Sequence, residues 1–281
     1  MLELACGLSS HELDAVAKLE ARTVQVDGGR LKLEWGVLSA RTGRDVEDVL
    51  WWDGDRLLGF LGLYAFGPPT VELAGMVDPT ARRQGIATEL LGAALPLCRD
   101  RGYQQALLVT SRSSTAGSSF ALGRGAVLEH SEHALVLSGP PTDGRTDPRI
   151  RLRTATAADA AEVSRLLASA FGWPPSDVME RLSTDTSRTL LVEFSGAAVG
   201  TLRLTREEGV AGVYGFAVDP AWRGRGIGRD VLRRACHLLR EEGAHRIGLE
   251  VAVENDHALG LYTSLGFTQV TTEDYYALPA I

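Results

Sequence analysis

The chain repeats itself, and this internal repeat limits the folds open to it more than any other feature. Residues 75–87 read GMVDPTARRQGIA and residues 216–228 read FAVDPAWRGRGIG, and an offset of 141 residues aligns them. Three further glycine pairs obey the same offset: Gly59 with Gly200, Gly102 with Gly243, and Gly125 with Gly266. Glycines and apolar residues that recur together at one spacing indicate a duplicated structural unit.

The length of the chain suits two domains. It has 281 residues, which is close to the size at which single hydrophobic cores stop growing. Residues 138–148 read SGPPTDGRTDP and lack apolar periodicity, which is typical of a linker. We therefore predict a first domain over residues 1–138, a linker over 139–148 and a second domain over 149–281.

Composition excludes several classes of protein. Hydrophobic residues make up 44% and charged residues 23% of the chain, so it is not mainly disordered. The net charge of −7 disfavours general binding to nucleic-acid phosphates. The most apolar stretch, 57–66, is too short to span a bilayer, and the N-terminus lacks the pattern of a secretory signal.

The cysteines and histidines predict neither a disulfide scaffold nor a metal site. Cys6, Cys98 and Cys236 are far apart and form no CxxC motif, which suits a reducing compartment. The histidines show no metal-ligand spacing either, including the pair His130 and His133. We expect a cytoplasmic protein without a metal ion.

Strand and helix signals alternate in the second repeat. Strand patterns cover 150–153, 189–194, 198–204, 210–218, 245–253 and 267–278, the last as one long strand or a pair. Helical patterns cover 157–170, 230–242 and 258–265. Ser195-Gly196 predicts a hairpin turn, and Gly243 a helix end. This order predicts a mixed α/β layer architecture.

A glycine-rich loop, Arg223-Gly-Arg-Gly-Ile-Gly228, separates a predicted strand from a predicted helix. Glycines let the backbone turn tightly, so that several N–H groups and the positive end of the helix dipole face one ligand. Arg223 and Arg225 add charged donors. The pattern matches neither a P-loop nor a dinucleotide-binding fingerprint. It predicts a phosphate site, and a surface turn with solvated arginines is the alternative.

The second repeat resembles the GNAT N-acetyltransferase superfamily. Val-Asp-Pro followed by Arg-x-x-Gly-x-Gly/Ala is similar to that family's acyl-CoA pyrophosphate loop, and Asn255, Ala258 and the run LYTSLGF at 261–267 are similar to its downstream signature. The resemblance covers both repeats. It implies an α/β fold of two tandem domains, each a mostly antiparallel mixed sheet flanked by helices, with a central pair of splayed strands. It also implies acetyl-CoA as co-substrate.

The resemblance also implies which residues contact coenzyme A. In the second repeat they are Phe216, Ala217, Val218, Arg223, Gly224, Arg225, Gly226, Ile227, Gly228 and Asn255. In the first repeat they are Val77, Arg82, Arg83, Gln84, Gly85, Ile86 and Ala87.

Acetyl transfer to an amine needs a deprotonated amine, a polarised thioester and a proton for the leaving thiolate. The resemblance assigns the polarising N–H to the strand 216–218 and the acid to Tyr262. Glu250, whose Leu-Glu-Val context is similar to that of ribosomal-protein N-terminal acetyltransferases, is the candidate base. Structural roles stay open for all three candidate side chains: a packed aromatic for Tyr262, a strand ion pair for Glu250 and a turn-forming residue for Asn255.

The first repeat lacks the catalytic residues. Under the offset, Val109 replaces Glu250, Ser114 replaces Asn255, and Phe120 or Ala121 replaces Tyr262. None of these side chains can serve as the tyrosine acid. We therefore expect the first domain to be degenerate, acting as structural support or as a wall of the acceptor site.

These observations predict an acetyl-CoA-dependent N-acetyltransferase that transfers the acetyl group directly to an amine in a ternary complex, with its active site in residues 149–281. The alternative class is a non-catalytic acyl-CoA-binding or scaffold protein. Within the enzyme class, mycothiol-synthase-like, aminoglycoside and protein N-terminal acetyltransferases stay open. The glutamate expected as base in mycothiol synthases is replaced here by Gly212.

The acceptor and the assembly are the least constrained features. A small-molecule amine or a peptide N-terminus is the expected acceptor, and a monomer or homodimer the expected assembly. Phe171-Gly-Trp173-Pro-Pro175 follows the first helix of the second repeat. In this family that region shapes the acceptor pocket, so it is a candidate for substrate contact.

Overall fold

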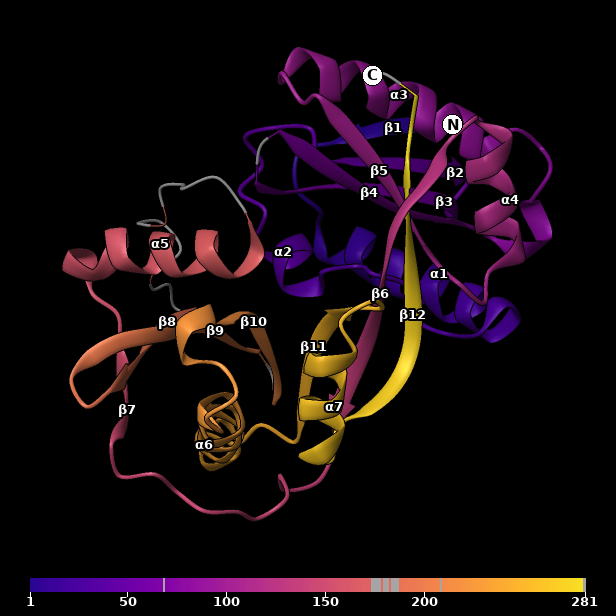
Figure 1. Ribbon diagram of the computed structural model, residues 1–281. Helices are drawn as coiled ribbons and strands as arrows, with labels where there is room; N and C mark the ends of the chain where they lie inside the picture. The colour runs from indigo at the N-terminus through magenta and orange to yellow at the C-terminus, as the bar shows by residue number, and fades with distance from the viewer. Residues whose placement is uncertain (68, 173–177, 179–181, 183–186, 208, 280–281) are drawn as a thin grey trace. The chain divides into compact units, whose positions relative to one another are not determined.

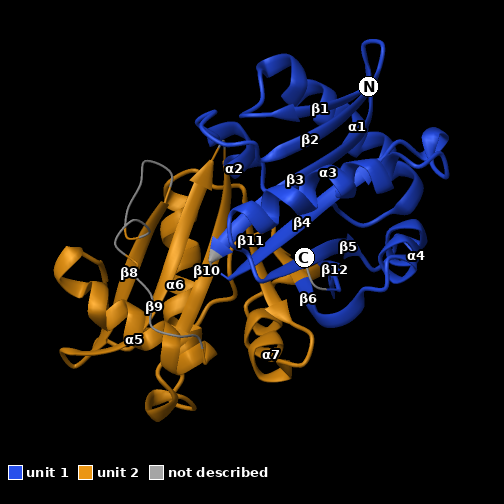
Figure 2. Cartoon of the chain, turned by 90° about the horizontal axis from the view of Figure 1, so that it is seen from above, with its two compact units in different colours: residues 1–133, 270–281 blue, residues 134–269 orange. Residues whose placement is uncertain are grey.

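The computed structural model of the chain describes residues 1–67, 69–172, 178, 182, 187–207 and 209–279. The chain forms two compact units (Figure 2). Unit 1 consists of residues 1–133 with 270–281, and unit 2 consists of residues 134–269. The two sequence repeats, 1–138 and 149–281, are a different division of the chain, and we keep the word "repeat" for them.

The elements of unit 1 carry the labels of Figure 1. Its strands are β1 (Leu2–Ala5), β2 (Asp48–Asp53), β3 (Arg56–Gly67), β4 (Thr70–Val77), β5 (Gln105–Ser111), most of β6 (Val127–Leu137) and most of β12 (Thr268–Ala277). Its helices are α1 (Ser10–Asp27), α2 (Trp35–Ala40), the short 3₁₀ turn η1 (Pro79–Ala81), α3 (Ile86–Asp100) and α4 (Thr115–Gly123). The sheet order is β1-β2-β3-β4-β5-β12, and only β4 and β5 are parallel.

Unit 2 has the same kind of sheet. Its strands are β7 (Ile150–Thr154), β8 (Ser187–Phe194), β9 (Ala197–Glu207), β10 (Val210–Val218) and β11 (Arg246–Ala252). Its helices are η2 (Ala157–Asp159), α5 (Ala160–Phe171), η4 (Pro220–Trp222), α6 (Ile227–Glu241) and α7 (Asp256–Ser264). The order is β7-β8-β9-β10-β11, and again only one pair, β10 and β11, is parallel. The predicted α/β mixed-sheet fold is confirmed.

The structure reproduces the sequence repeat element by element. Four pairs of elements have bounds that differ by the same 141 residues: η1 and η4, α3 and α6, β5 and β11, and α4 and α7. The paired glycines Gly102 and Gly243 have φ values of +75° and +94°, a left-handed conformation that side chains other than glycine rarely adopt. The predicted hairpin is also present, because Ser195 and Gly196 both have positive φ, as a type I′ turn requires.

The last strand of each repeat completes the other unit. β12 comes from the end of the second repeat, yet it pairs antiparallel with β5 of unit 1, from Glu273 opposite Ser111 to Ala277 opposite Leu107. The end of β6, residues 134–137, comes from the first repeat and lies next to β11 in unit 2. Leu135 and Leu137 are buried there in the core of unit 2. Each sheet therefore depends on a strand from the other repeat.

In unit 2 the central parallel strands part after a short pairing. β10 and β11 pair only from Val210 opposite Arg246 to Gly212 opposite Gly248, although both strands continue beyond these residues. On its other edge β10 carries an irregularity between Tyr214 and Ala217 where it pairs with β9. Such a bulge bends and twists its strand, which here turns the end of β10 away from β11. The predicted splayed strand pair is confirmed.

The corresponding strands of unit 1 are more regular. β4 and β5 pair over five positions, from Thr70 opposite Gln105 to Ala74 opposite Val109. The end of β4 keeps an unbroken register with β3, from Tyr64 opposite Glu72 to Gly59 opposite Val77. The gap between the two parallel strands is therefore shorter in unit 1 than in unit 2.

Candidate functional site

The loop after β10 is held in shape by Asp219. Its Oδ1 accepts a hydrogen bond from the backbone N–H of Ala221 at 3.0 Å, and its Oδ2 is 3.0 Å from Nη1 of Arg165 on α5. Hydrogen bonds from Arg165 lower the pKa of this carboxyl group, so it is ionised at neutral pH. The motif Val-Asp-Pro is shared by both repeats, but it did not indicate that the aspartate side chain binds Arg165.

The end of β10 offers a backbone donor to the gap between the strands. The N–H of Asp219 donates to the carbonyl of Val199 on β9 at 2.9 Å. Because successive residues of a strand direct their N–H groups to opposite sides, the N–H of Val218 faces away from β9 and toward the gap. Ala217 is buried, and Phe216 and Val218 are half-buried beside it.

The glycine-rich loop has the conformation that its sequence predicts. Gly224 and Gly226 have φ values of +75° and +79°, and neither has a neighbouring atom within 4 Å of the place where a Cβ would stand. The Nε of Arg223 donates to the carbonyl of Val218 at 3.0 Å and so ties the loop to the strand. The guanidinium of Arg225 lies 4.8 Å from the ring centroid of Trp222. Both arginines are exposed.

Helix α6 begins at Ile227 without a side-chain cap. Its first helical hydrogen bond runs from the N–H of Asp230 to the carbonyl of Gly226 at 3.1 Å. The N–H groups of the preceding first turn, including that of Gly228, therefore have no helical acceptor. Together with the helix dipole and the arginines of the loop, these groups favour an anionic ligand.

Gly228 allows α6 to approach α7 closely. A Cβ at this position would lie 3.3 Å from Cδ1 of Leu261 on α7 and 3.6 Å from Cζ of Phe216 on β10. Any larger residue would push these side chains away. The glycine thus sets the spacing between the loop, the end of β10 and α7.

Tyr262 lies on α7 with its ring in the core of unit 2. Its side chain is 8% exposed, and its ring centroid lies 6.2 Å from that of Phe267. Burial raises the pKa of its phenol to about 12, so it keeps its proton throughout the physiological range. Ile227 belongs to the same core, and Phe216 and Val218 pack against it. Tyr262, the first residue of α6 and the end of β10 therefore share one hydrophobic core.

Glu250 lies on β11 beyond the last residue paired with β10. Its neighbours Leu249 and Val251 are buried in the core that contains Tyr262. Because side chains alternate along a strand, Glu250 projects from the opposite face of the sheet. The sheet therefore separates the side chains of the two candidate catalytic residues.

Asn255 has a structural role in the fold. It is the N-cap of α7, and its Oδ1 accepts a hydrogen bond from the N–H of Ala258 at 3.1 Å. Ser114 caps α4 in the same way, with its Oγ 3.1 Å from the N–H of Gly117. The alternative expected from the sequence, a turn-forming residue, is present, and a contact of Asn255 with coenzyme A stays a prediction.

The corresponding loop of unit 1 has the same fold, but the side chain of its arginine, Arg82, is bound by other residues of unit 1. Arg82 donates from Nη1 and Nη2 to the carboxylate of Asp27 at 2.8 and 2.9 Å, and from Nε to the carbonyl of Val77. Ser114 also donates to Asp27, at 2.7 Å. Burial would raise the pKa of Asp27, but these hydrogen bonds outweigh it and hold the pKa below its usual value. Arg82 is thus largely committed within unit 1.

The other loop residues of unit 1 correspond to those of unit 2. Gly85 is the N-cap of α3, and Ile86 begins the helix and is buried. Gln84 is exposed and Ala87 is half-buried. Because α4 and α7 keep the same offset, Ala121 and not Phe120 stands where Tyr262 stands in unit 2. A methyl group cannot donate a proton, which agrees with the expected loss of the acid.

Part of the predicted acceptor region lies outside the described residues. This applies to Trp173, Pro174 and Pro175, whereas Phe171 ends α5 and is 42% exposed. In the described part of the chain, no three His, Cys, Asp or Glu side chains gather to bind a metal ion. The same residues contain no helix with the length and hydropathy needed to cross a bilayer. Cys6, Cys98 and Cys236 are free thiols.

Comparison with known proteins gives matches in both repeats. The acetyltransferase (GNAT) family matches residues 22–119 and again residues 160–267. A mycothiol acetyltransferase from Thermobispora bispora is 30% identical over 285 residues, which cover 94% of this chain and 95% of that protein. The N-alpha-acetyltransferase RimI of Mycobacterium tuberculosis is 33% identical over 133 residues, which cover 44% of this chain and 82% of that protein.

A solved structure shares the fold. The GCN5-related N-acetyltransferase from Sphaerobacter thermophilus superposes with a TM-score of 0.82 at 22% identity, covering 100% of this chain and 96% of that one. Its agreement concerns the fold alone. Since the two regions that match the family together span most of the sequence, the chain belongs to the GNAT family and is a tandem N-acetyltransferase.

Proposed function

We propose that unit 2 binds acetyl-CoA and transfers its acetyl group directly to an amine held in the same complex. One observation carries this proposal. The buried phenol of Tyr262 belongs to the same core as Ile227, the first residue of α6, and the splayed end of β10 packs against that core. This shared core supports a single site made of the proposed phosphate-binding loop, the gap with its backbone donor and the protonated phenol.

Each part has a separate task. The first-turn N–H groups of α6 and the side chains of Arg223 and Arg225 would hold the diphosphate of the coenzyme. The parted strands would admit its acyl-bearing arm, because their facing backbone groups are not paired with each other. The N–H of Val218 would donate to the thioester carbonyl and favour attack on its carbon.

Glu250 and Tyr262 are the candidate side chains for proton transfer. The new C–N bond forms as the C–S bond breaks, and Glu250 would accept the amine proton, directly or through water. The pKa of Tyr262, about 12, lies above the ordinary thiol value of about 8.5. Tyr262 would therefore act mainly as a hydrogen-bond donor to the departing sulfur. Any proton that it gives up is replaced by the one released from the amine.

The relatives support an amine acceptor of the mycothiol type, since a mycothiol acetyltransferase matches nearly the whole chain. The glutamate expected as base in such enzymes is replaced here by Gly212. A Cβ there would lie 2.4 Å from Cε2 of Tyr214, so the tyrosine ring already fills the space of a side chain. Glu250 is for this reason the candidate base in our proposal.

The test is acetyl transfer from acetyl-CoA to a panel of amines that includes the free-amine form of mycothiol and short peptides. Tyr262→Phe removes the donor and keeps the ring. We expect it to lower kcat by about 10²-fold, while the affinity for coenzyme A changes little. Tyr276→Phe is the matched control, because Tyr276 is a buried tyrosine of unit 1. Equal rates for the two variants would reject Tyr262 as the donor.

Glu250→Gln tests the base on the same panel. We expect kcat/KM to fall most at low pH, where the amine is protonated and depends on a base, and to recover toward wild type at high pH. A loss that is the same at every pH would show that Glu250 acts through structure and not through proton transfer.

A further inference from the structure

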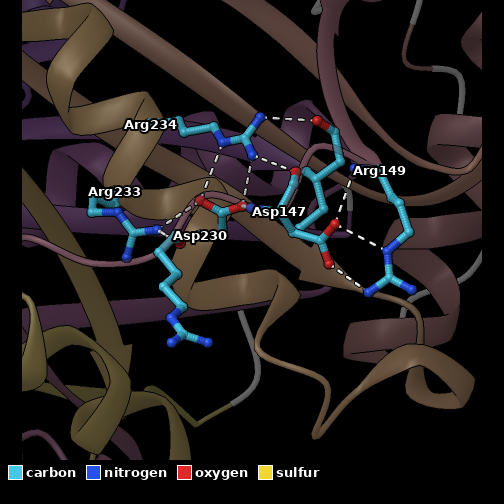
Figure 3. A network of polar contacts seen from close by, with 7 residues as sticks. Asp147, Arg149, Asp230, Arg233 and Arg234 are labelled. Carbon is cyan, nitrogen blue, oxygen red and sulfur yellow. Dashed lines mark hydrogen bonds and ion pairs between the residues drawn. The ribbon is translucent and has the colours of Figure 1, made fainter.

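The buried carboxylate of Asp230 in unit 2 is neutralised by arginine. Asp230 is 5% exposed and lies between Arg233 and Arg234 of α6, each 2.7 Å away (Figure 3). The same carboxylate accepts the backbone N–H of Asp147 at 2.9 Å, so it also binds the end of the predicted linker to α6. Planar guanidinium groups are the usual choice for a permanent buried ion pair. This network therefore has a structural role.

A buried cation of unit 1 is a lysine instead. The sequence has only two lysines, Lys18 and Lys32, among its 29 basic residues. The side chain of Lys18 on α1 is 68% exposed, whereas that of Lys32, between α1 and α2, is 8% exposed. Burying a lysine is unfavourable, because its compact ammonium group is strongly hydrated in water. The surroundings of Lys32 must therefore replace the water that the ammonium loses.

Carboxylates and aromatic rings surround this ammonium. Its Nζ lies 3.3 Å from Glu72 on β4 and 3.9 Å from Glu132 on β6, and it donates to the hydroxyl of Tyr275 on β12. The ring centroids of Tyr275 and Phe66 lie 5.0 and 5.8 Å from the same nitrogen. Carboxylates and aromatic faces are the groups by which proteins recognise organic ammonium ions. We call Glu72, Glu132, Tyr275 and Phe66 the cage.

The cage is supported by contacts other than those of Lys32. The hydroxyl of Tyr275 donates to Glu132 at 2.7 Å, and its ring stacks on that of His130 with 4.2 Å between the centroids. Glu72 lies on β4, which is paired with β3 and β5 at this position. The side chains of Glu72 and Glu132 are 21% and 27% exposed, so solvent reaches both carboxylates. A small ligand can therefore enter the cage once the lysine side chain is shortened.

Glu72 of the cage stands where Gly212 stands in unit 2. Glu72 pairs with Leu107 of β5. Gly212 pairs with Gly248 of β11, which follows Leu107 by 141 residues. The strand neighbours of both positions are buried in the cores that contain α3 and α6, so Glu72 projects from the face of its sheet that corresponds to the face of Glu250. Unit 1 thus places an ammonium group on the face that carries the candidate base in unit 2.

We propose that the cage is an amine-binding site of unit 1 and that Lys32 occupies it in place of a ligand. The ligand class that fits is a primary alkylammonium ion. Its three N–H donors match the two carboxylates and the phenol oxygen, and its charge faces two aromatic rings. By closing this site, Lys32 gives unit 1 a physical reason not to take up an amine. The inference goes beyond the proposed function of unit 2 and does not depend on it.

The first experiment empties the cage and fills it again. Lys32→Ala removes Cγ, Cδ, Cε and Nζ, the heavy atoms of n-propylammonium, and a cavity made by truncation can bind a molecule that fits it. Binding of n-propylammonium to the full chain is measured by calorimetry at constant ionic strength. We expect Lys32→Ala to bind it at least tenfold more tightly than the wild type does, the effect of about one charged hydrogen bond. The neutral n-propanol should bind to this variant at least tenfold more weakly than the amine.

Two lysine variants are the matched controls. Lys18→Ala removes the same atoms from an exposed position, and Lys32→Met keeps an unbranched side chain in the cage without its charge. Neither variant should bind n-propylammonium more tightly than the wild type. Equal affinities of Lys32→Ala and Lys18→Ala for the amine would overturn the inference, as would equal affinities of Lys32→Ala for the amine and the alcohol.

A measurement on the wild type keeps the inference testable if Lys32→Ala does not fold. Because the chain has two lysines, ¹⁵N-labelled lysine gives two side-chain NH₃⁺ signals in NMR spectra. The protons of Lys32 should be shifted upfield by the two rings and should exchange with water more slowly than those of Lys18. Equal shifts and exchange rates would show that the cage does not enclose the ammonium and would overturn the inference. None of these readouts involves coenzyme A, so acetyl transfer by unit 2 is tested separately.

Discussion

Arg83 and Gly224 stand at the same place in the two repeats and share a left-handed backbone, with φ values of +64° and +75°. A glycine adopts this conformation without strain. In an arginine the Cβ comes close to the backbone, and this contact destabilises the turn. Unit 1 therefore has the same left-handed turn without the glycine that suits it. The turn is required by the connection between strand and helix in both units.

This relationship predicts different responses to one substitution. Gly224→Ala should lower the free energy of unfolding by about 1 kcal/mol, because it introduces a Cβ at positive φ. Arg83→Ala should change it by less than about 0.5 kcal/mol, since the strain is already present there. Denaturant unfolding monitored by circular dichroism measures both. Equal losses of unfolding free energy in the two variants would contradict the strain that we assign to Arg83.

The two loops also predict the stoichiometry of coenzyme binding. Arg82 is committed to Asp27 in unit 1, whereas Arg223 of unit 2 is exposed. Calorimetric titration with acetyl-CoA should therefore give one site per chain. Gly226→Ala should weaken binding by about tenfold or more, because the first-turn N–H groups would shift, and the matched Gly85→Ala should leave the affinity unchanged. A stoichiometry near two would contradict this assignment.

The pKa of Tyr262 predicts the alkaline side of the pH profile. The donor must be protonated, and burial raises its pKa to about 12. With a peptide amine of ordinary pKa, about 7.7–8.0, kcat/KM should rise as the amine loses its proton and then stay level to about pH 11. Initial rates between pH 6 and 10.5 test this. A decline centred near pH 10 would mean that the essential phenol is not the buried Tyr262.

β12 comes from the second repeat but completes the sheet of unit 1. We therefore predict that a substitution on β12 destabilises unit 1. Tyr275 on β12 is 1% exposed in the core of unit 1, and its hydroxyl bonds Glu132 at 2.7 Å. Tyr275→Ala should cost about 3–5 kcal/mol of stability. Hydrogen exchange should then rise in 105–111 of unit 1 and change little in 246–252 of unit 2.

Val270→Ala is the control for this experiment, because Val270 lies on the same strand and is 45% exposed. Its effect should stay within about 0.5 kcal/mol. Increased exchange in 246–252 without a change in 105–111 would contradict the assignment of β12 to unit 1.

Much of the fold could be predicted because its turns carry local signals. Asp219-Pro220 follows the end of β10, Gly226 is the N-cap of α6, and Ser195-Gly196 forms the hairpin turn. Helix α6 starts at Ile227, three residues before the predicted start, because Gly228 interrupts the helical pattern while Ile227 is drawn into the core. Local propensity and tertiary packing compete at this helix end, and packing decides.

The remaining features depend on contacts that sequence periodicity does not specify. The alternation of β12 indicates a strand but not its neighbour, so the pairing with β5 could not be predicted. The bulge after Tyr214 arises only when β10 meets β9. Arg82 matched a phosphate-binding motif, but its partner Asp27 lies 55 residues earlier, and no local pattern joins them.

The position of β12 has a consequence for biosynthesis. β5 receives its second neighbour only when residues 273–277 have left the ribosome, so the sheet of unit 1 keeps an open, apolar edge while most of the second repeat is being synthesised. The sheet of unit 1 can therefore be completed only after the second repeat has been made. Nascent chains stalled before this point should be the species that most needs chaperone protection.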